Sequence, residues 1–346
     1  MSAVKVSVVL PCYNAEAYVR EAVASILGQT EGDLEILALD DGSTDGTGAI
    51  LAEMASEDSR VRVLTNPENL GLILTLNRGI SEARGEFVAR MDADDVALPH
   101  RLEEQLRVLQ EDPETGVVGS GIRLVDEERR PLAVVPPRAT APQSIRFLSL
   151  FATPIAHPSS VARREVLREH PYHAAAQTLH TEDYELFSRM IRAGVVLRNV
   201  PQPLLDMRVH AASVSRAFER IQIENFVRCA GAHLERMTDL RPPPQVLRVL
   251  VNRMNDDTQV ADLACGLGLL DRLWKRFRDR EPHPAVRGEI TAVADEQRLD
   301  ILLQALLRGE WRLRGAAAVL ALRYTHRLLS SASRSYLNRK LNHRRG

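Results

Sequence analysis

Cysteines are scarce in this 346-residue chain, and their arrangement suggests no shared site. Cys12, Cys229 and Cys265 are odd in number and far apart, and no Cys-x-x-Cys pair or Cys/His cluster is present. We therefore expect neither a disulfide framework nor a zinc site. A reducing compartment such as the cytoplasm fits this cysteine usage best.

Long apolar runs and a strong charge of one sign are also missing. No stretch reaches the roughly 18 uncharged apolar residues that a membrane-spanning helix requires. The N-terminus has none of the regions of a secretory signal. We expect a protein that is soluble or attached peripherally at the inner face of the membrane. A formal net charge of −1 gives no indication of nucleic-acid binding.

Short apolar runs alternate with longer amphipathic segments over the first 125 residues. Val6–Leu10 and Leu34–Leu39 have the pattern of buried strands, and Glu16–Leu27 between them has the apolar spacing of a helix. Val117–Gly119 and Ile122–Val125 resemble a pair of short strands. This order predicts an α/β domain with a mostly parallel sheet flanked by helices.

A change of pattern along the chain predicts two parts. We expect one domain over residues 1–215, with halves 1–125 and 126–215, and a helical C-terminal region over 216–346. Within that region, Val260–Gly268 superficially resembles the nucleotide loop of methyltransferases that use S-adenosylmethionine. A bare Gly-x-Gly is weak evidence, and the strands of such a domain are missing. We expect Gly266 and Gly268 to break or end a helix instead.

Polar clusters follow three of the predicted strands. Pro11, Tyr13 and Asn14 follow the first, Asp40–Asp45 follows the second, and Asp92–Asp95 follows the fourth. In an open parallel sheet, ligands bind outside the carboxyl ends of the strands. The three clusters are therefore expected to converge on one rim, although turn chemistry alone also explains Asp40–Asp45.

Asp92 and Asp94 are the most informative pair. Two carboxylates separated by one residue can point at one hard cation, and oxygen ligands favour Mg²⁺ or Mn²⁺. Such a cation neutralises a diphosphate leaving group. The alternative is an acidic loop ahead of the helix that starts near Pro99. Three acids in four residues after a buried strand favour the metal site.

These motifs together resemble glycosyltransferase family 2, whose members are inverting enzymes with a GT-A fold. The likeness covers about Val4–Ser215 and is specific in the order and spacing of its parts. The matching stretches are Val8–Asn14, Asp40–Asp45, Asn69–Gly71, Ala83–Glu86, and Asp92–Asp95 with Pro99 and Arg101.

The resemblance implies roles on the donor side, in residues 1–125. Pro11, Tyr13, Asn14 and Asp41 would bind the base and ribose of a nucleotide-sugar, usually a UDP-sugar. Asp94 would be the ligand of Mn²⁺ or Mg²⁺, and Asp92 would contact the donor ribose or sugar. Asn69 and Asn77 would line the donor pocket, although Asn69 fits a turn before Gly71 equally well.

The acceptor half, residues 126–215, would supply the catalytic base. By the resemblance this is Asp183, with Glu182 as the fallback, at the start of a helix predicted over Thr181–Ala193. Locally, a Thr181 cap and helix-dipole effects explain the same acids.

Two further matches to the family lie on this side of the chain. His157 matches a family stretch near the acceptor, although a lone histidine beside proline also fits a structural role. Arg208, His210, Ser213 and Ser215 resemble the family's closing loop. There Arg208 would contact phosphate oxygens and His210 would be a metal ligand or diphosphate contact.

The C-terminal stretch 311–346 contains nine Arg or Lys residues and no Asp or Glu. A basic amphipathic helix can lie on an anionic membrane, but this one can equally pack on the rest of the protein.

The leading hypothesis is a metal-dependent glycosyltransferase acting on a glycan or lipid-linked acceptor in surface polysaccharide or glycolipid synthesis. The alternatives are a nucleotidyltransferase, whose basic Gly-rich loop is missing here, and a non-catalytic sugar-nucleotide-binding module. The sugar, the linkage and the oligomeric state are not readable from the sequence.

Overall fold

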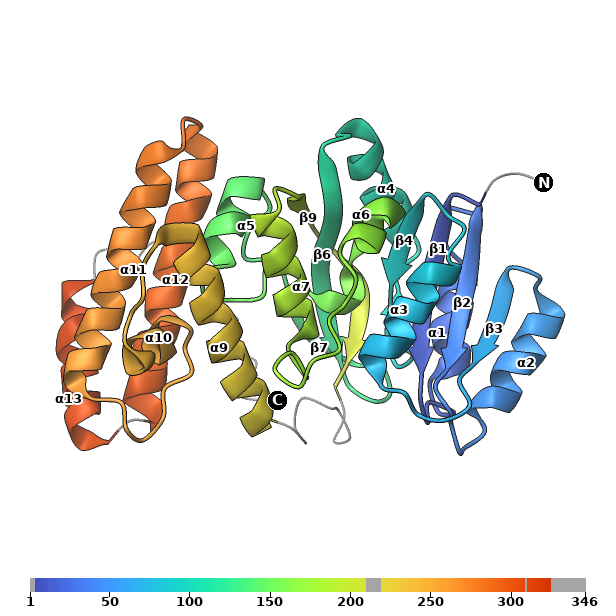
Figure 1. Cartoon of the computed structure of the whole chain (residues 1–346), viewed down its shortest axis with the longest axis horizontal. Helices are drawn as coiled ribbons and strands as arrows, with labels where there is room; N and C mark the ends of the chain where they lie inside the picture. The colour runs from blue at the N-terminus through green and yellow to red at the C-terminus, as the bar shows by residue number, and fades with distance from the viewer. Residues whose placement is uncertain (1–3, 210–218, 309, 325–346) are drawn as a thin grey trace. The chain divides into compact units, whose positions relative to one another are not determined.

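The computed structural model describes residues 4–209, 219–308 and 310–324, which form two compact units (Figure 1). The first, called the sheet unit, comprises Met1–Pro137 and Ile155–Ala217. The second, called the helical unit, comprises Arg138–Pro154 and Phe218–Gly346.

A nine-stranded sheet forms the centre of the sheet unit, in the order β3-β2-β1-β4-β8-β6-β9-β5, with β7 paired to β6. The first four strands along this order are parallel, so their carboxyl ends share one edge. The strands are β1 (Val6–Cys12), β2 (Leu34–Asp40), β3 (Val61–Thr65), β4 (Phe87–Arg90), β5 (Val96–Ala97), β6 (Thr115–Val125), β7 (Pro131–Val135), β8 (Val161–Arg163) and β9 (Val196–Arg208).

Helices cover both faces of this sheet because successive side chains of a strand point to opposite sides. Val8 and Leu10 of β1 join the core beneath α1 (Val19–Leu27), α2 (Thr47–Glu57) and α4 (Arg101–Glu111). Val9 points the other way, against α3 (Leu72–Glu82). Gly79 permits this approach, since a Cβ there would lie 2.6 Å from Val9 Cγ1. With α6 (Arg164–Glu169) and α7 (Glu182–Arg192), this confirms the predicted α/β architecture.

The predicted pair of short strands near residue 120 is wrong. Residues Thr115–Val125 form one strand, β6, which pairs in parallel with β9 along its length. The register shifts between Ser120 and Ile122, opposite Pro201 and Pro203 of β9. Proline donates no ladder hydrogen bond, so the pairing bulges there and continues beyond.

The helical unit contains a segment that the sequence pattern placed in the acceptor half. Arg138–Pro154 groups with this unit because Phe147 packs 5.4 Å from Phe277, centroid to centroid, and Glu289 accepts two hydrogen bonds from Thr140. The boundary near residue 215 stays a prediction. The helices are α5 (Pro142–Leu148), α9 (Glu219–Thr238), α10 (Pro244–Leu250), α11 (Val260–Arg280), α12 (Pro284–Arg308) and α13 (Trp311–Arg323).

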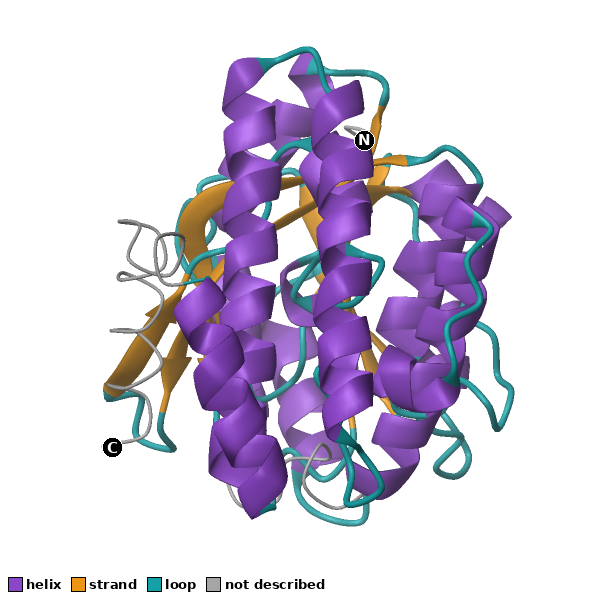
Figure 2. Ribbon diagram, turned by 90° about the vertical axis from the view of Figure 1, so that its left-hand side faces the viewer, coloured by secondary structure: helices purple, strands orange, loops and turns teal. Residues whose placement is uncertain are grey.

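Helices α11, α12 and α13 pack side by side (Figures 1 and 2). Gly266 and Gly268 do not break α11, contrary to the sequence-based expectation. A Cβ on Gly266 would collide with Val249, so this glycine allows α10 to pack closely on α11. Among the described residues, no helix has both the length and the apolarity needed to span a membrane.

Candidate active site

Loops after β1, β2 and β4 lie at the carboxyl edge of the sheet, where a parallel sheet was expected to bring them together. Strand β1 lies between the other two, with Cys12 opposite Asp40 and Val9 accepting a hydrogen bond from Met91 N at 3.2 Å. Burial raises the pKa of the Cys12 thiol, and the charges of Asp40 and Asp92 raise it further. Asp40 at the end of β2 and Asp92 in the loop after β4 therefore lie near the end of β1.

The loops after β1 and β2 are tied into one rim. Asn14 Oδ1 accepts a hydrogen bond from Thr44 N at 2.9 Å, and Ser43 Oγ accepts one from Asn14 N at 3.1 Å. Gly46 N donates to Glu16 Oε2 at 2.7 Å. Asn14 has a φ of 48°, a left-handed conformation that asparagine tolerates well. The side chain of Asn14, predicted to bind nucleotide, thus holds the rim together.

Asp41 organises the loop after β3. Its buried carboxylate accepts hydrogen bonds from Asn66 Nδ2 at 2.7 Å and from the backbone N–H groups of Leu70 and Gly71 at 2.9 Å. Asn69 Oδ1 also accepts from Gly71 N, at 2.9 Å, which supports the turn alternative for Asn69. Any contact of Asp41 with a nucleotide remains a prediction.

Tyr13 and Pro11 complete the end of β1. Tyr13 is 49% exposed, so its ring is accessible at the rim. Pro11 pairs with Leu39 inside the sheet and is only partly buried. Both residues lie at the end of β1, and their contact with a nucleotide stays a prediction.

Three carboxylates of the loop after β4 form a candidate metal centre. Oxygen atoms of Asp92, Asp94 and Asp95 lie within 4.8 Å of one another. Asp95 is 2% exposed, and one of its oxygens accepts a hydrogen bond from Arg208 N at 3.0 Å. The other oxygen, Oδ2, is buried and has no hydrogen-bond partner in the described structure.

The electrostatics of this loop favour a cation. Burial raises the pKa of Asp95 well above the usual range, and the charges of Asp92 and Asp94 raise it further. Burial also raises the pKa of Asp92, against the opposing charge of Arg90. A crowded, partly desolvated set of carboxylate oxygens is compatible with a hard divalent ion.

Arg90 connects the acidic loop to the start of α7. Its buried guanidinium holds Asp92 through two nitrogens, at 2.8 and 2.5 Å. The same positive charge acts to lower the pKa of both Glu182 and Asp183. Arg101, part of the family motif, is itself buried and donates to the Arg90 carbonyl at 2.6 Å. Arg90 also lines a small cavity together with Leu186 and Phe187 of α7, so it lies between the acidic loop and this helix.

Asp183 lies in the first turn of α7 and is half-buried. Burial and then the charge of Glu182 raise the pKa of Asp183 to about 7, although its carboxylate accepts a hydrogen bond from Tyr184 N at 2.7 Å. Thr181 stands at the N-cap of the helix, but its side chain makes no capping hydrogen bond, since its hydroxyl donates to Thr178 O. A carboxyl group with this pKa suits a general base.

Asn77 and His157 hold the chain that leads into α7. The Asn77 amide makes two 2.9 Å hydrogen bonds with the backbone of Tyr172. The Tyr172 hydroxyl lies 2.7 Å from His157 Nε2. Burial lowers the pKa of His157 well below its usual range, so the ring is neutral, and it packs edge-on against Phe187 of α7. Asn77 is thus engaged here, and its predicted contact with the donor is untested.

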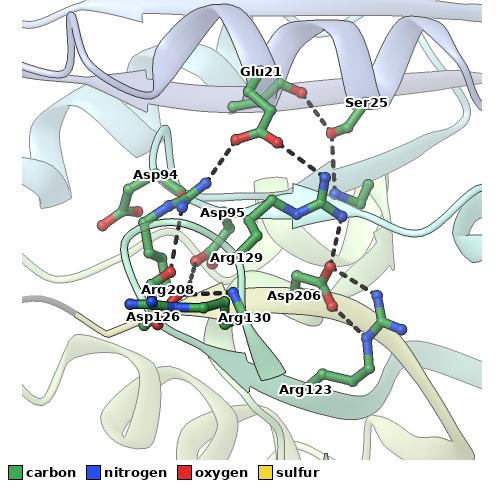
Figure 3. Close-up of polar contacts among 12 residues, drawn as sticks. Glu21, Ser25, Asp94, Asp95, Arg123, Asp126, Arg129, Arg130, Asp206 and Arg208 are labelled. Atoms are coloured by element: carbon green, nitrogen blue, oxygen red, sulfur yellow. Dashed lines mark hydrogen bonds and ion pairs between the residues drawn. The ribbon is translucent and has the colours of Figure 1, made fainter. Parts of the chain in front are cut away.

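Arg208 is hydrogen-bonded to the acidic loop and to helix α1 (Figure 3). Its Nε donates to Asp94 O at 3.0 Å, and its Nη2 pairs with Glu21 at 2.7 Å. Its Nη1 donates to Glu127 O, and its guanidinium lies 4.7 Å from the Tyr18 ring centroid. A phosphate contact by Arg208, as predicted, would require some of these bonds to break.

The rest of the predicted closing loop cannot be placed in the same way. His210, the second predicted metal ligand, lies outside the described residues together with Ser213 and Ser215. Its role stays a prediction.

Other charged residues extend the Arg208 network across the sheet. Glu21 also pairs with Arg129 at 2.9 Å, and Arg129 pairs with the buried carboxylate of Asp206 at 2.8 Å. Arg123 holds the same carboxylate through two nitrogens (Figure 3). Helix α1, the β6–β7 turn and β9 are thereby fixed around the acidic loop.

Replacing Arg208 with alanine should lower the free energy of unfolding by about 2–4 kcal/mol, because three backbone carbonyls and Glu21 lose the charged donor of a buried side chain. Urea denaturation of the whole chain measures this change. Arg130→Ala is the control in the same network, since that side chain is 72% exposed and should have almost no effect. Equal loss in the two variants would contradict the structural role of Arg208.

Comparisons with known proteins agree with this arrangement. The model of the family "Glycosyl transferase family 2" matches residues 7–170. An uncharacterized glycosyltransferase of Haemophilus influenzae is 33% identical over 234 residues, which cover 63% of this chain and 70% of the relative. The putative glycosyltransferase EpsE of Bacillus subtilis is 31% identical over 225 residues, covering 64% and 80%. The chain belongs to glycosyltransferase family 2.

Superposition on solved structures of other proteins shows that this glycosyltransferase has the GT-A fold, as predicted. Residues 1–349 of S. aureus TarS, crystallised with UDP-GlcNAc, superpose with a TM-score of 0.56 at 18% identity, covering 93% of this chain and 92% of that one. The mannosyltransferase PcManGT of Pyrobaculum calidifontis, in complex with GDP-Man and Mn²⁺, gives a TM-score of 0.53 at 20% identity, covering 98% and 84%.

Two residues of the site were not assigned a role from the sequence. Arg90 and Asp95 flank the recognised Asp92/Asp94 pair, and both are buried. The signal was present for Asp95 as a third adjacent acid. For Arg90, a charged residue at the end of a strand with an otherwise apolar pattern was the available sign.

Proposed function

We propose that this glycosyltransferase is an inverting enzyme that transfers a sugar from a nucleotide-diphosphate sugar, most simply a UDP-sugar, to a hydroxyl acceptor. The acceptor is a surface glycan or a lipid-linked glycan, and the enzyme works at the cytoplasmic side. The observation that carries the proposal is the acidic loop after β4, where oxygens of Asp92, Asp94 and Asp95 lie within 4.8 Å of one another and Asp95 Oδ2 is buried without a hydrogen-bond partner.

The proposed reaction is one displacement at the anomeric carbon. Asp183 accepts the proton of the acceptor hydroxyl as its oxygen attacks from the face opposite the diphosphate. The bond from the anomeric carbon to the diphosphate oxygen breaks as the new glycosidic bond forms, through an oxocarbenium-like state. One base is sufficient, and no covalent sugar–enzyme intermediate is needed.

Asp92, Asp94 and Asp95 would hold Mn²⁺ or Mg²⁺ beside this reaction. The set fits such an ion because all its ligand atoms are carboxylate oxygens and one of them is buried without a hydrogen-bond partner. When bound, the ion supplies charge neutralisation for the departing diphosphate. His210 would complete the site if its predicted role holds.

The donor assignment can be tested with a panel of UDP-, GDP- and other nucleotide-sugars, each with Mn²⁺, with Mg²⁺ and with EDTA. Calorimetry measures donor binding, and release of free nucleotide diphosphate measures transfer or hydrolysis. We expect metal-dependent binding and slow hydrolysis of one class of donor. If every donor bound equally well with EDTA and none was hydrolysed, the protein would be a non-catalytic binding module and the proposed reaction would be wrong.

The pH dependence of transfer follows from Asp183. Because its pKa is raised to about 7, the carboxyl group is protonated at lower pH and cannot act as a base. With saturating donor and metal, kcat should rise with pH through this region and then level off, following one deprotonation. A profile that is flat across neutral pH while proton transfer limits the rate would argue against Asp183 as the base.

A further inference from the structure

Helix α13 has two apolar sides, and only one of them is covered. Leu313, Ala317 and Tyr324 are nearly or fully buried in the helical unit. On the other side Trp311 is 76% exposed and Leu322 is 72% exposed. Helices of globular proteins usually present a polar face to solvent, so large apolar side chains exposed on this side are unusual.

The exposed residues share one stripe of the helix. Trp311, Val319 and Leu322 stand at i, i+8 and i+11, and Gly315 and Ala318 between them are also exposed. We call these five residues the α13 stripe. Its small central residues leave the tryptophan and the two aliphatic side chains as its projecting groups.

The helix that carries the stripe is firmly attached to the helical unit. The Tyr324 hydroxyl donates to Asp271 at 2.9 Å, and the same carboxylate holds Arg298 at 2.7 Å. Arg298 is fully buried and lies 5.6 Å from the Tyr324 ring centroid. The exposure of the stripe is therefore a property of a packed helix.

Basic residues lie close to the stripe in the sequence. Arg312 and Arg314 are exposed in its first turn. From Trp311 to the C-terminus the sequence has nine Arg or Lys residues and no Asp or Glu, whereas the preceding 310 residues have 36 and 46 respectively. Glu310, just before the helix, is the nearest acidic residue in the sequence. The sequence from Trp311 onward is thus net basic, whereas the part that precedes it is net acidic.

We propose that the α13 stripe docks on the surface of an anionic lipid bilayer. Trp311 would enter the interfacial layer, where tryptophan is favoured, with Val319 and Leu322. The positive charges in the first turn of α13 and in the basic C-terminal sequence would add long-range attraction to the lipid phosphates. A second copy that docked through its own α13 stripe would bring like-charged arginines together, whereas an anionic bilayer would attract them, so charge favours the bilayer over this dimer.

Trp311 provides a direct measurement with the intact chain. It is one of two tryptophans, and the other, Trp274, is 5% exposed. Addition of phosphatidylcholine vesicles containing phosphatidylglycerol should shift the emission of Trp311 to the blue. Bromine-labelled lipid should then quench it. Vesicles of phosphatidylcholine alone should give neither change, and added salt should weaken the effect.

Two sets of variants separate the contributions in vesicle co-sedimentation. Trp311→Ala with Val319→Ser and Leu322→Ser, and separately Arg312→Glu with Arg314→Glu, should each weaken partitioning about tenfold. The matched controls are Leu132→Ser with Val134→Ser, at 44% and 53% exposure, and Arg107→Glu with Arg241→Glu. The controls should bind as the wild type does.

Three results would overturn the proposal. One is equal binding by the stripe variant, provided that circular dichroism shows it folded. Another is equal binding to neutral vesicles. The third is a dimer in analytical ultracentrifugation that the stripe variant abolishes, without lipid binding by either protein. No sugar donor enters these assays, so their outcome is independent of the proposed transfer reaction.

Discussion

Replacing Asp183 with asparagine is expected to reduce kcat about a thousandfold, within the range of roughly 10²–10⁴ that general-base catalysis supplies. Asparagine keeps the size of the side chain and can still accept the hydrogen bond from Tyr184 N. It cannot take a proton from the acceptor hydroxyl. Donor affinity, measured by calorimetry with metal present, should change little because the acidic loop is untouched.

Two further variants of α7 make this result specific. Glu185→Gln is the matched control, since Glu185 pairs with Arg189 on the same helix and has no assigned catalytic role. It should keep most of the activity. Glu182→Gln tests the fallback base. Loss of transfer in Glu182→Gln with full turnover in Asp183→Asn would move the base to Glu182, and full turnover in both would remove it from this helix.

The sheet edge was predictable from the sequence because it depends on local patterns. Buried parallel strands appear as short apolar runs, and polar residues directly after them must lie at the carboxyl ends. The convergence of Asp40 and Asp92 around Cys12 follows from that rule and strand order alone. The role of Asp183 did not follow from local pattern, since acids in a first helical turn have an ordinary explanation. It required the family resemblance.

The partners of individual side chains were not predictable. Asn14, Asn69, Asn77 and Arg208 were expected to face the donor, and in the described structure their side chains bond to the protein. Asparagine and arginine serve a ligand and a backbone group with the same atoms. Only the three-dimensional path of the loops decides between the two uses.

Long-range pairing explains the other differences. Arg138–Pro154 joins the helical unit through contacts with residues more than a hundred positions later, such as Thr140 with Glu289. The pairing of β9 with β6 shifts its register at two prolines of β9 and then continues to the end of both strands. Neither arrangement leaves a periodic signal in the sequence, so a local reading of the chain misses both.

Replacing Asp94 with alanine is expected to abolish metal-assisted donor binding and to lower transfer by about three orders of magnitude, since the loss of Lewis-acid stabilisation costs several kcal/mol. Binding of Mn²⁺ to the wild type and the variant, followed by electron paramagnetic resonance of the free ion, tests the first part without any turnover. The remaining pair, Asp92 and Asp95, leaves too few carboxylates for a tight site.

Asp95→Asn sharpens this test, because it changes one atom of the candidate centre. The amide can keep the hydrogen bond from Arg208 N at Oδ1, while the buried, unpartnered Oδ2 becomes an NH₂ group that cannot bind a cation. Mn²⁺ affinity should therefore fall although the loop stays in place. Glu86→Ala is the control, since its side chain is 67% exposed and lies outside the candidate centre. Unchanged Mn²⁺ binding in both Asp94→Ala and Asp95→Asn would show that the acidic loop is not the metal site, and the proposed stabilisation of the leaving diphosphate would have to come from elsewhere.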